Sequence, residues 1–344
     1  MTKPAPNNSR IVQTNKKRVF SGVQPTGNLH LGNYLGAISQ WVEYQETYDN
    51  IFCVVDLHAI TIPEAIDPVE LHKKNREVAM LYIACGIDPE KSVVFIQSHI
   101  KEHAELAWIL NCFTPLGWLE RMTQYKSKSL KQESVGTGLL IYPALQAADI
   151  LLYDTHVVPV GQDQKQHIEI TRDIAERFNA MYPGTFVVPD LLIRESGAKI
   201  MGFDSPEEKM SKSTGEERPG HSIGLLDAPG SMKKTIMRAV TDSGAETRFE
   251  HASPGVVNLL TIYELITKLP RPEIEDQFEG KGYGTLKKAV LEVIQAHLEP
   301  IKERHTELAK DPAEFDRLLA KGADQIRPIA EATINRVKEN LGMG

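Results

Sequence analysis

Short runs of β-branched and other apolar residues alternate with helical patterns along the first two thirds of this 344-residue chain. Four runs have the composition of buried strands, at residues 19–23, 51–57, 92–97 and 156–160. The segments between them place apolar residues at helical spacing, as at Leu31, Leu35, Ile38 and Val42. Strands and helices in this order predict a parallel sheet covered by helices on both faces, which is a doubly wound, Rossmann-like α/β domain.

One of the expected helices has well-defined ends. Asp67 is a favourable N-cap, Pro68 suits the first helical position, and Glu70 stands at the third. Gly86 follows the last residue of the apolar pattern, where a glycine commonly ends a helix. The sequence therefore predicts a helix that begins at Pro68 and ends just before Gly86.

The pattern changes after residue 204. Residues 205–220 carry a single large apolar side chain, Met210, among charges, serines and glycines, which predicts an exposed, mobile loop. Beyond this loop, apolar stripes at helical spacing run through 286–301 and 315–337. We therefore expect four parts: a disordered extension (1–17), an α/β domain (18–204), the loop (205–220) and an α-helical domain (221–344), whose last helices can pack back on the α/β domain.

Composition narrows the classes of function. With 39 basic and 46 acidic residues, the net charge is −7, which argues against coating nucleic acid by bulk positive charge but permits a local basic patch. Cys53, Cys85 and Cys112 lack metal-ligand spacing and suggest reduced thiols, typical of the cytoplasm. Residues 1–17 lack the apolar core of a secretory signal, and the most apolar stretch, 138–160, is too interrupted by polar residues to span a membrane.

A glycine-rich turn follows the first expected strand, at residues 21–36. Such a turn between a strand and a helix binds phosphates in α/β folds, because backbone N–H groups face the anion and glycine permits close approach. An ordinary turn is the alternative. The spacing matches neither a dinucleotide fingerprint nor a P-loop. Instead, His30 and Asn33 flank Leu31-Gly32, so that both polar side chains can face a nucleotide at the carboxyl edge of the sheet.

Two lysines lie three residues apart in the expected loop, in Lys209-Met210-Ser211-Lys212-Ser213. They can close on a polyphosphate and neutralise the charge that develops on a leaving pyrophosphate. A solvated surface loop that happens to contain two lysines is the alternative.

These two segments resemble the signatures of the class I aminoacyl-tRNA synthetases. His30-Leu31-Gly32-Asn33 is similar to their His-Ile-Gly-His motif, and 209–213 is a full match to their Lys-Met-Ser-Lys-Ser motif. The finer resemblance, to the tryptophanyl-tRNA synthetase family, covers the chain from Arg18 onward. The matching stretches are 20–37, 56–61, 120–129, 142–155, 158–179, 199–203, 239–243 and 279–284. Two positions depart from the family's commonest pattern, with Gln146 where many members have Met and Gln162 where Glu is usual.

The resemblance implies a tryptophan–tRNA ligase. The carboxylate of tryptophan would attack the α-phosphate of ATP, and the aminoacyl group would then pass from the adenylate to the 3′ end of tRNA(Trp). Mg²⁺ would be held mainly by the ATP phosphates, with no metal site of the protein and no organic cofactor. The resemblance also implies a catalytic α/β domain, a helical domain that binds the anticodon, and a cytoplasmic homodimer that binds neither membrane nor DNA.

The same resemblance implies a set of site residues. ATP would contact the first turn, the segment at Gly161 and the lysine loop, at Gln24, Pro25, Thr26, His30, Gly32, Asn33, Gly161, Gln162, Asp163, Ile200, Lys209, Met210, Ser211, Lys212 and Ser213. The catalytic charge would come from Lys209 and Lys212, helped by Lys128 or Lys126, although a merely basic surface is the alternative for that last pair. The tryptophan pocket would be lined by Phe20, Gly22, Gln24, His58, Gln146 and Asp149.

Asp149 lies in an apolar helical context, where a buried carboxylate is costly unless it is paired. From the residues alone, an aspartate that caps a neighbouring element or pairs with an arginine is the simpler interpretation. The resemblance instead implies that Asp149 accepts the indole N–H of tryptophan, which excludes phenylalanine, while rejection of tyrosine rests on the shape of the pocket. A tyrosyl-type enzyme and a catalytically inactive paralogue that binds tryptophan or RNA are the alternative functions.

Overall fold

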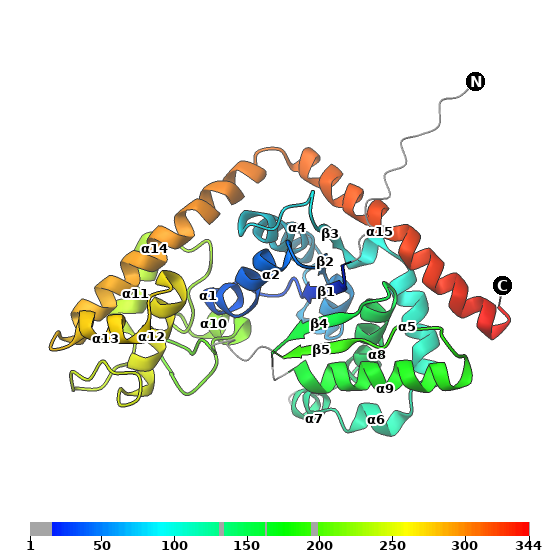
Figure 1. Cartoon of the computed structure of the whole chain (residues 1–344), viewed down its shortest axis with the longest axis horizontal. Coiled ribbons are helices and arrows are strands. Elements are labelled where there is room, and N and C mark those ends of the chain that lie inside the picture. The colour runs from blue at the N-terminus through cyan, green and yellow to red at the C-terminus, as the bar shows by residue number, and fades with distance from the viewer. Residues whose placement is uncertain (1–15, 131–133, 162–163, 194–198, 344) are drawn as a thin grey trace.

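Five parallel strands form one sheet in the order β3–β2–β1–β4–β5 (Figure 1). The computed structural model describes residues 16–130, 134–161, 164–193 and 199–343, so the expected N-terminal extension falls almost entirely outside the described residues. The strands are β1 (Arg18–Val23), β2 (Asp49–Val54), β3 (Val93–Ile96), β4 (Val157–Val160) and β5 (Asp190–Ile193). The predicted doubly wound α/β domain is confirmed.

The sequence missed part of this sheet. β5 was not predicted, because its short Leu-rich run lacks the β-branched character of the other strands. β2 ends at Val54 rather than at Leu57, since Asp56–Ala59 form the short helix α3. The predicted strand, 51–57, therefore includes residues that have already left the sheet and begin α3.

Helices cover both faces of the sheet because successive side chains of a strand point to opposite sides. Phe52 and Val54 pack in a core with α2 (Ser39–Tyr44) and α4 (Pro68–Ala84). Ile51 and Cys53 pack in a second core with α5 (Glu102–Phe113), α8 (Thr137–Leu151) and α9 (Lys165–Met181). β2 is therefore buried over its whole length, which explains its continuous apolar run.

The helix expected after Asp67 is confirmed as α4. Asp67 Oδ1 accepts hydrogen bonds from the backbone N–H of Val69 at 2.8 Å and of Glu70 at 3.0 Å. At the other end, Gly86 has φ of +114°, a conformation that other residues rarely adopt. Both ends of α4 are thus determined by local chemistry that is visible in the sequence.

The remaining helical elements complete the chain. In the α/β domain these are α1 (Leu31–Asn33), the π-helical turn η2 (Tyr34–Ile38), α3, the 3-10 turns η3 (Pro63–Ala65) and η4 (Gln97–His99), α6 (Leu116–Glu120) and α7 (Thr123–Ser129). The C-terminal part contains α10 (Lys212–Glu217), α11 (Pro229–Arg238), α12 (Pro254–Thr267), α13 (Arg271–Phe278), α14 (Tyr283–Leu308) and α15 (Pro312–Leu341). Among the described residues, no helix is both long enough and apolar enough to cross a membrane.

The last two helices connect the helical part to the sheet. α14 rises from the helical part and α15 descends along the other side of the molecule, so that the two form an inverted V (Figure 1). α15 packs on β3 and α5, as the sequence allowed. A Cβ atom at Gly322 of α15 would lie 2.0 Å from the carbonyl oxygen of Val94, so only glycine permits this approach. Further along α15, the Arg336 guanidinium forms an ion pair with Asp154 at 2.6 Å.

The segment expected to be an exposed loop, 205–220, contains regular structure. Residues Lys212–Glu217 form α10, whose N-cap is Ser211. Met210 is buried in the same core as α4 and α12. The single apolar side chain of this segment therefore anchors it, an effect that a count of polar residues does not reveal.

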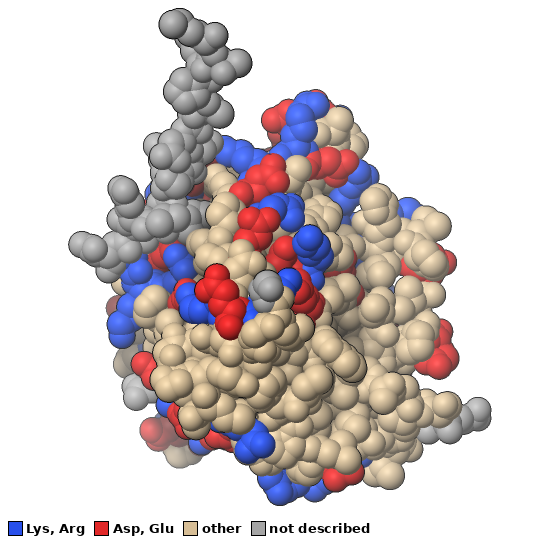
Figure 2. All heavy atoms as spheres, turned by 90° about the vertical axis from the view of Figure 1, so that its right-hand side faces the viewer, with Lys and Arg blue, Asp and Glu red and all other residues tan. Residues whose placement is uncertain are grey.

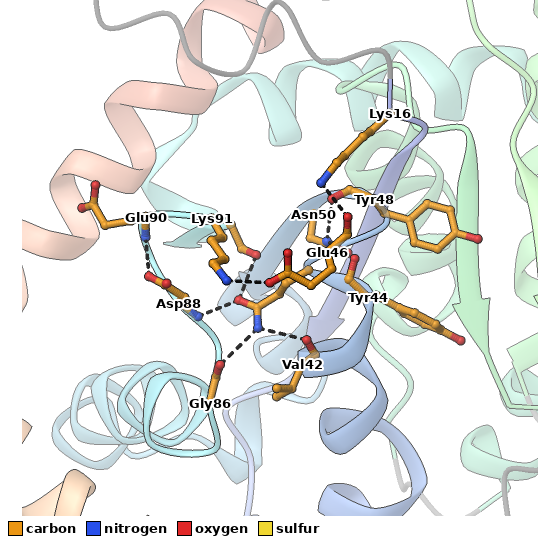
Figure 3. Close-up of polar contacts among 12 residues, drawn as sticks. Lys16, Val42, Tyr44, Glu46, Tyr48, Asn50, Gly86, Asp88, Glu90 and Lys91 are labelled. Atoms are coloured by element: carbon orange, nitrogen blue, oxygen red, sulfur yellow. Dashed lines mark hydrogen bonds and ion pairs between the residues drawn. The ribbon is translucent and has the colours of Figure 1, made fainter.

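A buried polar network holds the amino-terminal edge of the sheet, away from the carboxyl edge (Figure 3). The Gln45 side-chain amide donates to the carbonyl oxygens of Val42 and Gly86, both at 3.1 Å, and its Oε1 accepts from the backbone N–H of Asp88 at 2.6 Å. Asn50, fully buried at the start of β2, donates to the carbonyl oxygen of Tyr44 at 3.0 Å. The bonds of Gln45 join the end of α2 to the loop between α4 and β3, and the bond of Asn50 joins it to β2.

We predict that Gly322→Ala destabilises the chain. The added methyl group must displace either α15 or β3, because its nearest neighbour is a backbone oxygen. The free energy of unfolding should fall by about 1–3 kcal/mol, measured by denaturant titration. Gly284→Ala in α14 is the matched control, since a Cβ there meets no atom within 4 Å. Equal stability of the two variants would contradict the close packing of α15 on the sheet.

Candidate active site

A cavity of about 440 Å³ opens at the carboxyl edge of the sheet, between β1 and β4. The register joins all six residues of β1 to β2, and Val19 to Val157 of β4. Residues 20–24 and 158–160, at the carboxyl ends of these two strands, line the cavity. The chain order reverses between β1 and β4, and such a switch point is where open α/β sheets bind ligands.

The cavity gathers many of the residues proposed from the sequence. Those that line it are Phe20, Gly22, Gln24, Thr26, His58, Lys128, Gln146, Asp149 and Lys212. They come from β1, the turn after it, α3, α7, α8 and α10. Segments that are almost 200 positions apart in the chain therefore contribute to one space, as the two sequence signatures required.

Asp149, on α8, is 1% exposed and has two histidine partners. Its Oδ2 lies 2.8 Å from His58 Nε2, and its Oδ1 lies 2.7 Å from His103 Nδ1. Gln97 Nε2 donates to Oδ1 at 2.6 Å. Burial raises the pKa of Asp149, but the hydrogen bonds and charges of His103 and His58 outweigh burial and lower this pKa to about 2. Asp149 is therefore a carboxylate, held by histidines rather than by an arginine or by a cap of another element.

The first turn of α1 is closed by its own side chains. His30 is the N-cap of α1; its Nδ1 accepts from the backbone N–H of Asn33 at 3.3 Å, and the Asn33 Oδ1 accepts from the backbone N–H of His30 at 3.1 Å. Burial first, and then the charge of Lys212, lower the pKa of His30 to about 3. A neutral, buried His30 thus shapes the turn, and the contact of His30 and Asn33 with a nucleotide stays a prediction.

Lys212 joins α10 to the glycine-rich turn. Its Nζ donates to the carbonyl oxygen of Gln24 at 2.9 Å. Gly27 has φ of +62° and packs against the Lys212 side chain. A Cβ at Gly27 would be 2.8 Å from the Cβ of Lys212. Burial first, and then the charge of Lys74 on α4, lower the pKa of Lys212 to about 8. Lys212 is therefore a cation at neutral pH, but one that loses its proton more readily than an exposed lysine.

Backbone hydrogen bonds hold the turn after β1 against residues 223–225, which follow the lysine segment in the chain. The N–H of Leu31 donates to the carbonyl oxygen of Ile223 at 2.8 Å, and the N–H of Leu225 donates to that of Leu29 at 2.9 Å. The N–H of Met210 donates to the carbonyl oxygen of Ile200 at 2.9 Å. The turn after β1 and the lysine segment are thus neighbours in space.

Several residues proposed for ATP lie near the cavity but do not line it. Met210 belongs to the apolar core, Ser211 caps α10, and Lys209 forms a β-bridge with Met201. The others outside the lining are Pro25, His30, Gly32, Asn33, Gly161 and Ile200. Gln162 and Asp163 lie outside the described residues, and Ser213 is described only as part of α10.

Sequence reasoning missed polar residues around the cavity. Tyr142 and His167 both line it, and the Tyr142 hydroxyl lies 2.7 Å from His167 Nε2. Gln97 and His103 contact Asp149 from behind the cavity. Each of these residues stands alone in its own helix or turn, so no spacing pattern in the sequence identifies it as part of a site. Among the described residues, no group of three or more His, Cys, Asp or Glu side chains could hold a metal ion.

Comparisons with known proteins agree with this geometry. The family model of class I tRNA synthetases (W and Y) matches residues 13–299. A tryptophan–tRNA ligase of Wolinella succinogenes is 53% identical over 329 residues, which are 95% of this chain and 99% of that protein. A structure of tryptophanyl-tRNA synthetase from Campylobacter jejuni, complexed with ADP and tryptophan, is 38% identical, has a TM-score of 0.82 and aligns over 94% of this chain and 99% of its own. That from Mycoplasma pneumoniae is 34% identical, with a TM-score of 0.88 over 96% and 98% of the two chains.

The chain therefore belongs to the family of class I tRNA synthetases for tryptophan and tyrosine. Within that family, the three relatives above are tryptophan enzymes that match over nearly the full length of both chains. The resemblance inferred from the sequence is confirmed.

The depressed pKa of Lys212 predicts a pH dependence. The ammonium is present below pH 8 and is lost as the pH rises through about 8, so kcat/KM for ATP should fall above that pH. Lys212→Arg keeps its charge at high pH and should lack this basic limb, even if its overall rate is lower. The measurement is the pH profile of ATP–pyrophosphate exchange, with Lys233→Arg on the exposed face of α11 as the control. An unchanged basic limb in Lys212→Arg would assign it to another group.

Proposed function

We propose that this chain joins L-tryptophan to tRNA(Trp) in two steps at the cavity between β1 and β4. In the first step the tryptophan carboxylate attacks the α-phosphate of ATP, which gives tryptophanyl-adenylate and pyrophosphate. In the second step the aminoacyl group passes to the 3′ end of the tRNA. Because the substrate supplies its own nucleophile, the protein contributes alignment and charge stabilisation.

One observation carries this proposal: a buried carboxylate and a lysine of opposite charge line the same cavity. Asp149 would accept the indole N–H, which is the only polar group of the tryptophan side chain. Phe20 and Gln146 would contact the ring from the sides. The amino acid would then extend from Asp149 toward the glycine-rich turn, where its carboxylate meets the nucleotide.

The lysine segment would hold the phosphates. Lys212 and Lys209 would neutralise the charge on the leaving pyrophosphate, and Lys128 would approach from α7 across the cavity. Mg²⁺ would enter with ATP and be held mainly by its phosphates and by water. Gln24, Thr26 and Gly32 would contact the nucleotide at the first turn.

The central experiment is amino-acid-dependent ATP–pyrophosphate exchange with tryptophan, with tyrosine and with no amino acid. We expect exchange with tryptophan alone. Lys212→Ala should reduce it by roughly a hundredfold or more, because a charge that acts on the transition state is removed. Lys233→Ala on α11 is the control and should exchange at the rate of the unaltered chain.

Two other outcomes have clear meanings. Exchange with tyrosine instead of tryptophan would make this a tyrosyl-type enzyme and would remove the proposed role of Asp149. Binding of tryptophan without exchange would make it an inactive paralogue.

The helical part would bind the anticodon region of the tRNA. Among the basic residues of this part, Lys268 is paired with Glu43 and Arg271 with Glu264. α11 exposes Lys233, Lys234 and Arg238 on its surface. With a net charge of −7, the chain needs such a localised strip to attract a phosphate backbone.

We predict that replacing Lys233, Lys234 and Arg238 together by alanine impairs aminoacylation but not adenylate formation. KM for tRNA(Trp) should rise by roughly tenfold, and binding of tRNA should depend less steeply on salt concentration. ATP–pyrophosphate exchange without tRNA is the internal control. Unchanged aminoacylation kinetics would place the tRNA contact on another surface.

The chain would act as a homodimer joined through the α/β domain. Seen from the side of α5 and the C-terminus, the lower part of the molecule forms a broad area with few charges (Figure 2). Trp108 on α5, Leu116 on α6 and Met181 at the end of α9 are 72%, 58% and 46% exposed. An uncharged area with exposed large apolar side chains is typical of an interface. Sedimentation of the intact chain as a monomer at micromolar concentration would contradict the dimer.

We also propose a cytoplasmic location, where ATP and tRNA are available. The three cysteines of the chain are free thiols, with Cys53 and Cys85 buried and Cys112 exposed. Free thiols fit a reducing compartment. Recovery of the chain in a membrane or extracellular fraction would contradict this location.

A further inference from the structure

The two oxygens of Asp149 differ in how many hydrogen bonds they accept. Oδ1 has two donors, Gln97 Nε2 at 2.6 Å and His103 Nδ1 at 2.7 Å. Oδ2 has one, His58 Nε2 at 2.8 Å. A carboxylate oxygen has two lone pairs in its plane. Oδ1 is therefore saturated, and Oδ2 keeps one lone pair for a further donor.

The lining of the cavity shows where that lone pair faces. His58 lines the cavity together with Asp149, whereas Gln97 and His103 do not. Oδ2 is thus the oxygen on the cavity side, and Oδ1 faces the interior between α8, α5 and η4. A ligand in the cavity meets a single acceptor position at this end.

The ring of His103 is held by Tyr153 as well as by Asp149. The Tyr153 hydroxyl lies 2.6 Å from His103 Nε2, and both side chains are fully buried. Because the Asp149 carboxylate only accepts, His103 must carry a proton on Nδ1, which points at Asp149. Tyr153 thus holds the ring of His103 at the nitrogen that faces away from Asp149. Phe95 stacks on His103 and also contacts the ring of Tyr153, with centroid distances of 6.0 Å and 5.9 Å.

We propose that His103 and Gln97 are positioning residues for amino-acid recognition, which hold Asp149 so that its Oδ2 faces the cavity as an acceptor for an N–H group. Tyr153 supports them by holding the ring of His103. This inference rests on the proposed function of the cavity. It adds the residues that orient the acceptor.

The geometry suits an indole N–H. An indole N–H only donates, and Oδ2 keeps one lone pair to accept it. The donors of His58, His103 and Gln97 are already directed at Asp149, so the carboxylate faces a ligand as an acceptor.

The test removes the donor of His103 while the acceptor stays. In His103→Leu, Asp149 loses one of the groups that stabilise its charged form, so burial raises its pKa. KM for tryptophan should rise roughly 10–100-fold with little change in KM for ATP. A new acid limb should also appear, with kcat/KM for tryptophan falling as the pH is lowered. The titratable and charged groups near the Asp149 carboxylate are His58, Cys53, His103 and Tyr153, with Lys128, Lys212, Tyr142 and His167 on the same cavity.

His103→Asn is the conservative rescue. The asparagine amide can occupy the place of Nδ1 and donate to Asp149 Oδ1, so this variant should keep a flat profile between pH 5 and 8, with KM for tryptophan within about tenfold of the unaltered chain. Tyr153→Phe should raise KM for tryptophan a few-fold, because the ring of His103 loses its second hydrogen bond. Tyr263→Phe in α12 is the matched control; it removes a hydroxyl that accepts from Gln277 at 2.9 Å, far from the cavity.

Two results would overturn the proposal. One is a flat pH profile with normal KM for tryptophan in His103→Leu. The other is an equal loss for ATP and tryptophan in both His103 variants, which would indicate a merely structural role. If His103→Leu fails to fold, His103→Asn and Tyr153→Phe still decide the question through KM for tryptophan. Absence of exchange in the unaltered chain would refute the proposed function itself, and not the positioning of Asp149.

Discussion

The pairing of residues 29–31 with 223–225 is the contact on which the site depends. These backbone hydrogen bonds, 2.8 and 2.9 Å long, fix the turn after β1 against the chain that follows the lysine segment. Lys212 can reach the carbonyl of Gln24 only because that segment is held there. Met210, buried in the adjoining core, anchors the same segment from the other side. Without this pairing, the ammonium of Lys212 and the glycine-rich turn would belong to separate parts of the molecule.

The cavity carries a negative charge at Asp149 and a positive charge at Lys212. A buried carboxylate is costly, but Asp149 accepts three hydrogen bonds, so its ionised form persists. Lys212 donates to the carbonyl oxygen of Gln24, and burial lowers its pKa to about 8. One end of the cavity is thus anionic, and the other is cationic. In the proposed reaction, this polarity would orient the amino acid and the nucleotide relative to each other.

Local patterns predicted local structure well. Asp67 and Gly86 marked both ends of α4, because caps and left-handed residues act over only a few positions. The parallel sheet followed from the order of strands and helices. β5 was missed because its short run contains a single β-branched residue, Ile193. The helix α10 was missed because Met210 acts through a core that is built by distant segments.

For the site, the sequence by itself determined the chemistry of the two signatures and, through them, the family, because these residues lie close together in the chain. It also pointed to Asp149 as a carboxylate with a special role. Only the tertiary structure decided the partners of Asp149. His58, Gln97 and His103 come from α3, η4 and α5, three separate elements that meet at this carboxylate. It likewise showed that His30 and Asn33 cap the start of α1. Such long-range hydrogen bonds depend on how helices pack on the sheet, and no periodicity within a single segment encodes them.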